Sequence, residues 1–136
     1  MNPVAFPFRH VTHPFPTRRP FLPIRLTVGS LSVDTEALVD SGADVSVLPY
    51  DLGLQLGLSW SNAILLPAVG GSFSSTQTRA ALVTGEVAPF APVRLGFAWV
   101  QSNATPVILG ITNFFLEFDV CFFAGRGEFT IVPRTP

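Results

Sequence analysis

The sequence predicts a mostly β fold, largely antiparallel, with one or two short helices. Short segments rich in Val, Leu and Thr recur along the chain from residue 24 onward, as is typical of strands. Glycine-containing dipeptides separate several of these segments, and tight turns between strands favour glycine. Only residues 50–58 and 110–118 combine apolar spacing and end signals that suit a short helix. The sequence contains no internal repeat.

The first part of the chain is predicted to be an extended arm. Residues 1–23 hold six of the 13 prolines, and proline fixes φ and lacks an amide donor, which disfavours a helix or a central strand. Four phenylalanines of this segment indicate that it lies on an apolar surface: Phe6, Phe8, Phe15 and Phe21. We therefore divide the chain into a Pro- and Phe-rich arm, residues 1–18, and a folded domain, residues 19–136.

The elements of the folded domain follow in order. Residues 24–29 and 31–40 predict a hairpin that turns at Gly29 and Ser30. A short strand at 45–49 leads into a helical turn that ends at Gly57. Residues 63–83 predict a second, longer hairpin with Gly70 and Gly71 at its tip. Further strands are expected at 91–100 and 105–109, then a short helix within 110–118, and finally a closing hairpin over 119–133 around residues 125–127.

The composition favours a chain that buries surface against a second copy. The sequence is 48% hydrophobic and only 12% charged, about half the usual charged share. A single small domain hides so much apolar surface poorly, so a homodimer is expected. The net charge of −1 argues against a nucleic-acid partner. No apolar run of about 18 residues predicts a membrane span, and without a signal-peptide pattern we expect an intracellular, by default cytoplasmic, protein.

The sequence predicts neither a metal site nor a cofactor. His10 and His13 are three residues apart in the arm, but no third ligand lies near them in the sequence. Cys121 is the one cysteine, so it has no partner within the chain for a disulfide. We expect Cys121 to be a small buried hydrophobic side chain.

The candidate for chemistry is Asp40, which follows the apolar residues 37–39 and precedes Ser41, Gly42 and Ala43. Ionised carboxylates are rarely buried without partners, so this placement needs a reason. Gly42 permits a tight turn, and the Ser41 hydroxyl can hold a neighbouring group. Such a turn suits a carboxylate that meets a second carboxylate, because two acids about 3 Å apart share one proton. One acid can then accept a proton from water while the other donates to a carbonyl.

Residues 37–49, ALVDSGADVSVLP, resemble the active-site stretch of retropepsin-like aspartic proteases, whose signature is two apolar residues followed by Asp, Thr or Ser, Gly and Ala. Residues 106–115, PVILGITNFF, resemble the second motif of that family. Residues 118–133 are similar to the terminal hairpin of its bacterial single-domain members. Residues 19–29, RPFLPIRLTVG, resemble the amino-terminal stretch of retroviral proteases, and Gly70 and Gly71 sit where the family keeps its flap tip.

The resemblance implies a closed, barrel-like half of an acid protease that assembles as a two-fold homodimer, with one catalytic aspartate per chain. Asp40 would be the catalytic acid, Ser41 would brace the pair of acids, and Gly42 would complete the catalytic turn. The implied substrate is an extended peptide, and the residues implied to bind it are Ala43, Asp44, Val69, Gly70, Gly71, Ser72, Phe73, Val107 and Ile108.

The resemblance also implies an ion pair across the dimer, from Arg19 of one subunit to Asp44 of the other. The physical case for this pair is independent: a carboxylate just past the turn needs compensation, and the planar guanidinium of arginine suits a two-point contact. Arg18 and Arg25 are the alternative donors.

Other functions fit the sequence less well. Asp40 could simply cap a turn. Ser41 and Ser46 lie outside a G-x-S-x-G motif, and no histidine occurs in the β region to activate them. The segment 40–46 loosely resembles a phosphorylation-dependent recognition peptide, but Val39 and Val45 indicate burial instead. The competing hypothesis is a catalytically silent dimerisation or peptide-binding module with the same fold.

Overall fold

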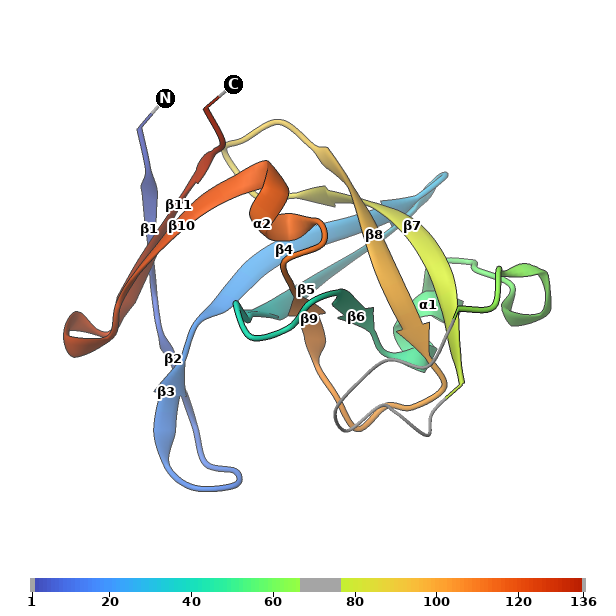
Figure 1. Cartoon of the computed structure of the whole chain (residues 1–136), viewed down its shortest axis with the longest axis horizontal. Helices are drawn as coiled ribbons and strands as arrows, with labels where there is room; N and C mark the ends of the chain where they lie inside the picture. Colours follow the sequence, from blue (N-terminus) through green and yellow to red (C-terminus); the bar gives the residue numbers. More distant parts are fainter. Residues whose placement is uncertain (1, 67–76, 136) are drawn as a thin grey trace.

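The computed structural model describes residues 2–66 and 77–135, and its central feature is a closed six-stranded barrel (Figure 1). The barrel order is β4 (Phe21–Val28), β5 (Leu31–Val39), β9 (Val107–Leu109), β6 (Ser46–Leu48), β8 (Val93–Val100) and β7 (Thr78–Glu86). The pairs β5–β9 and β6–β8 are parallel, and the other four pairs are antiparallel. The predicted fold class, a mostly β, largely antiparallel, closed barrel, is confirmed.

Alternation along the strands builds the barrel core. In β4, Leu22, Ile24 and Leu26 are buried while Pro23 and Arg25 are exposed, because successive side chains of a strand point to opposite faces. Pro23 has no amide donor, and it lies outside the β4–β7 ladder, because β7 pairs only with Arg25–Thr27. On its other side Pro23 is opposite Glu36 of β5. The strand therefore begins at Phe21, earlier than the predicted residue 24.

Both ends of the chain meet in a second, three-stranded sheet of order β1-β11-β10 (Figure 1). It contains β1 (Val4–Pro7), β10 (Phe118–Phe123) and β11 (Glu128–Pro133), and η3 (Ala124–Arg126) forms the turn of the β10–β11 hairpin. Gly127 adopts a left-handed φ of 66°, which suits glycine at this turn. Phe6 of β1 stacks on the buried ring of Phe129, with centroids 5.7 Å apart.

The predicted burial of Cys121 is wrong, because its side chain is exposed. Cys121 belongs to β10, in which Phe118 and Val120 turn toward the core. Because successive side chains of a strand point to opposite faces, Cys121 points away from the side that Val120 faces. Cys121 is therefore on the outer face of the three-stranded sheet, on the same side as Asp119.

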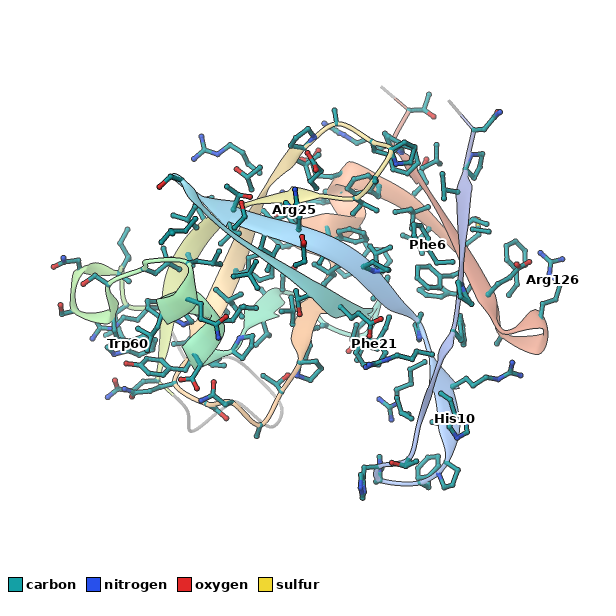
Figure 2. The ribbon with its side chains drawn as sticks, turned by 180° about the vertical axis from the view of Figure 1, so that it is seen from behind. Phe6, His10, Phe21, Arg25, Trp60 and Arg126 are labelled. Carbon is teal, nitrogen blue, oxygen red and sulfur yellow. The ribbon has the colours of Figure 1, made fainter. Side chains whose placement is uncertain are left out.

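The rest of the amino-terminal segment forms a hairpin of β2 (Arg9–Val11) and β3 (Thr17–Arg19). This hairpin is a separate two-stranded sheet that projects away from the barrel (Figures 1 and 2). Prolines 14 and 16 lie in its loop, where no ladder hydrogen bond is needed.

The helices are short. Helix α1 (Tyr50–Gln55) follows β6 and is succeeded by Gly57, whose φ is 80°, as the sequence predicts for a helix end. A 3-10 turn, η1 (Trp60–Asn62), lies at the end of the barrel remote from β1 (Figure 2), and α2 (Phe114–Glu117) precedes β10. Gly53 faces the indole of Trp99, and a Cβ at this position would overlap that ring. Within the described residues, no helix is long and apolar enough to cross a membrane.

Candidate active site

Asp40 begins a tight turn directly after β5, and its backbone is fixed from two sides. The amide of Asp40 donates to Leu109 O of β9 (2.9 Å), while the preceding amide, Val39 N, donates to Pro20 O (3.0 Å). Within the turn, Ala43 N donates to Asp40 O (3.2 Å), and Gly42 N donates to the carboxylate atom Asp40 Oδ1 (2.9 Å). The carboxylate is therefore oriented by its own turn, and it is half-buried.

The segment after β9 lies against this turn and holds it in place. Ile111 N donates to Ala43 O (2.8 Å), and Thr112 N donates to Asp44 O (2.9 Å). The two segments approach so closely that a Cβ on Gly110 would lie 2.5 Å from Val45 O and 2.7 Å from Ala43 O. Only glycine fits this contact without a backbone shift, which explains the glycine of the second motif.

Ser46 and Asn113 support the turn, and the sequence analysis did not select either of them as a site residue. The Ser46 hydroxyl is fully buried and accepts a hydrogen bond from Gly110 N (3.0 Å). Asn113 joins the segment to β8: its Oδ1 accepts from Gly96 N (2.9 Å) and its Nδ2 donates to Arg94 O (2.9 Å). The available signal was a polar residue inside an apolar run, namely Ser46 between Val45 and Val47 and Asn113 before Phe114.

The remaining predicted residues differ in accessibility. Ser41, Gly42 and Asp44 are exposed, and Ala43 is half-buried. Val107 faces the barrel core at 2% exposure, whereas the next residue, Ile108, is half-buried. The structure therefore brings Asp40, Ser41, Gly42, Ala43 and Asp44 together in one turn, with β9 beside it.

The predicted flap residues Val69, Gly70, Gly71, Ser72 and Phe73 lie outside the described residues. The stem of the second predicted hairpin is described up to Leu66 and from residue 77 onward. Leu66 N donates to Thr78 O (2.9 Å), Ala80 N donates to Ile64 O (2.8 Å), and Leu65 pairs with Arg79 in an antiparallel bridge. The two sides of this hairpin are thus antiparallel where the structure describes them.

The two charged residues that were predicted to pair across the dimer differ in exposure. Arg19, at the end of β3, is half-buried, and Asp44 is exposed. The ion pairs found within the described part of the chain are Arg9–Glu36, Arg25–Asp34 and Arg126–Glu128, so neither Arg19 nor Asp44 takes part in them. No cluster of three or more potential metal-ligating side chains occurs within residues 2–66 and 77–135.

Comparisons with known proteins bear on the fold. No protein-family model matches the sequence, and no curated protein matches it. Among solved structures, the chain is similar to a retropepsin-like aspartic protease from Rickettsia conorii, with a TM-score of 0.66 and 9% sequence identity. The match covers 96% of this chain and 91% of that chain. At this identity the similarity establishes a shared fold, which is the retropepsin-like barrel.

Proposed function

We propose that this chain is an aspartic endopeptidase that acts as a homodimer, with one Asp40 contributed by each subunit. The observation that carries the proposal is the position of Asp40 in a retropepsin-like barrel. Its carboxylate is oriented by Gly42 N at 2.9 Å, and its backbone is fixed to β9. Since each chain has one such turn and no internal repeat, a pair of carboxylates requires two chains.

In the proposed reaction, a water molecule lies between the two Asp40 carboxylates, which share one proton. The ionised carboxylate accepts a proton from the water as the water oxygen attacks the scissile carbonyl carbon. The protonated carboxyl donates its proton to the carbonyl oxygen, which gives a neutral tetrahedral diol. The carboxyl that took the proton from water then donates it to the amide nitrogen, while the other carboxylate accepts a proton from a diol hydroxyl. The C–N bond breaks, the carboxylic acid and amine products leave, and the two acids again share one proton. No metal or cofactor takes part in this reaction.

The substrate of this proposal is an extended peptide. The exposed residues of the Asp40 turn, Ser41, Gly42 and Asp44, offer surface to such a chain, and the half-buried residues Ala43 and Ile108 offer apolar surface beside them. Residues 69–73 remain predicted substrate contacts, whereas Val107, which was also predicted to bind substrate, faces the barrel core instead. We also propose that Arg19 pairs with the partner subunit's Asp44, since both are without an ion-pair partner within the described residues.

The test is peptide hydrolysis by wild type beside Asp40→Asn, with a denatured protein mixture as substrate and sequencing of the fragments. Wild type should release fragments, and its rate should follow a bell-shaped pH profile on the acidic side of neutral. Asp40→Asn should fold and dimerise but lose hydrolysis by a factor of at least about a thousand. Hydrolysis that survives in Asp40→Asn contradicts the mechanism, whereas peptide binding without any hydrolysis by wild type supports the silent module.

A further inference from the structure

We propose that the β2–β3 hairpin, residues 9–19, is an arm that grips a second copy of this chain, an inference that rests on the dimeric function proposed above. The hairpin projects away from the barrel and from the β1-β11-β10 sheet (Figures 1 and 2). Its two strands pair with each other and with no other described strand. An isolated two-stranded hairpin is only marginally stable in water, so we expect contact with another protein surface to stabilise this hairpin.

The base of the hairpin is fixed, which sets the direction in which the arm leaves the barrel. Arg9 pairs with Glu36 of β5, with Nη1 and Oε2 2.7 Å apart. The same guanidinium lies 4.0 Å above the ring of Phe21, the first residue of β4, in a cation–π contact. The guanidinium of Arg9 therefore contacts both β4 and β5 and attaches the hairpin to the barrel.

This base is also adjacent to the candidate catalytic residue. Pro20, which follows the hairpin, accepts a hydrogen bond from Val39 N (3.0 Å), and Val39 directly precedes Asp40. If two Asp40 carboxylates meet on a two-fold axis, the bases of both hairpins lie close to that axis. An element anchored so near that axis is in a position to contact the partner subunit.

The chemistry of the arm complements the rest of the chain. All nine acidic residues lie from Asp34 onward, whereas four of the eight arginines precede it, and three of them (Arg9, Arg18 and Arg19) belong to the hairpin. Phe15 lies in the hairpin loop between two prolines and is 59% exposed. Arg9 is already paired with Glu36 of its own chain, so Arg18 and Arg19 are the cations of the hairpin that the acidic remainder of a second copy would complement. The exposed ring of Phe15 in the loop supplies the apolar anchor of such an interface.

The test is the dimer dissociation constant, measured by sedimentation equilibrium on the full chain. Phe15→Ala should raise this constant about tenfold, because it removes the anchor. Leu82→Ala is the matched control: Leu82 of β7 is 60% exposed but lies on the barrel, so its removal should leave the constant unchanged. Arg19→Ala should raise the constant and make it less sensitive to added salt. Circular dichroism checks that each variant is folded.

The outcomes separate this inference from the proposed function. A dimeric wild type whose dissociation constant is unchanged by Phe15→Ala overturns the arm and leaves the protease proposal standing. A hairpin-dependent dimer that cuts no peptide supports the arm and contradicts the protease. A wild type that stays monomeric contradicts both. If Phe15→Ala instead abolishes binding to phosphatidylserine-containing vesicles with no change in dimerisation, the arm faces a membrane and the inference is overturned.

Discussion

At the scale of single residues, polar groups inside apolar segments mark the positions that hold the Asp40 turn. Asp40 follows the apolar residues 37–39 at the end of β5 and receives a hydrogen bond from Gly42 N. The buried Ser46 hydroxyl accepts from Gly110 N at 3.0 Å, so that amide is satisfied away from water. Removing this hydroxyl would leave the buried amide of Gly110 without its acceptor. These groups thus hold the backbone that presents the carboxylate.

An exposed ion pair gives a residue-scale prediction about pH. Hydrogen bonds from Arg25 to Asp34 (2.7 and 3.1 Å) lower the pKa of the Asp34 carboxyl in the folded chain. A lowered folded pKa stabilises the fold above the unfolded pKa, and that contribution disappears as pH falls through the folded pKa. The melting temperature of wild type should therefore exceed that of Asp34→Asn by a small margin near neutrality, and the margin should shrink in acid.

Thermal melts between about pH 7 and pH 2 check this prediction, since they span the ordinary aspartate range. Arg25→Gln is the matched variant, because it removes the same pair from the other side and should lose the same pH-dependent margin. A margin that stays constant down to the lowest pH would contradict the assignment of this effect to the Arg25–Asp34 pair.

At the scale of elements, β9 connects the two parts of the site. It runs parallel to β5 on one side and antiparallel to β6 on the other, so the strands before and after the Asp40 turn both hydrogen-bond to it. The segment that follows it then closes on the turn through Ile111 N and Thr112 N. The position of Asp40 therefore depends on a strand that is distant in the sequence.

A glycine substitution tests this dependence. The Cβ of Gly110→Ala would meet backbone atoms, Val45 O at 2.5 Å and Ala43 O at 2.7 Å, which cannot rotate away. We expect Gly110→Ala to destabilise the fold by about 1–3 kcal/mol. Peptide hydrolysis should fall further than the folded fraction does, because the turn that carries Asp40 must shift. Chemical denaturation and hydrolysis rates measure the two effects.

The control for this prediction is Gly96→Ala in β8. An added Cβ at Gly96 meets nothing within 4 Å, so the substitution should leave stability and hydrolysis close to wild type. Equal behaviour of the two variants would mean that the close approach at Gly110 does not hold the turn.

At the scale of the whole molecule, local patterns predicted the strands and turns well but long-range contacts poorly, and the closure of the strands into a barrel was predicted only from the family resemblance. The strands, the helix end at Gly57 and the closing hairpin have local turn and alternation signals. In contrast, the prolines of residues 1–18 argue against a helix but do not indicate that β1 pairs with β11 at the other end of the chain. The exposure of Cys121 and the bonds of Asn113 to β8 likewise depend on strand partners, which no local pattern specifies.

The whole assembly gives the last prediction, which concerns subunit mixing. If hydrolysis needs one Asp40 from each subunit, a dimer of wild type with Asp40→Asn has one carboxylate and is inactive. After subunit exchange with a ninefold excess of the variant, about a tenth of wild-type subunits remain in wild-type dimers by random pairing. Hydrolysis per wild-type subunit should fall to that level, while an equal mass of an unrelated protein should have no effect. Undiminished hydrolysis after complete exchange would mean that each chain works alone, because only a shared site makes one subunit's activity depend on its partner's carboxylate.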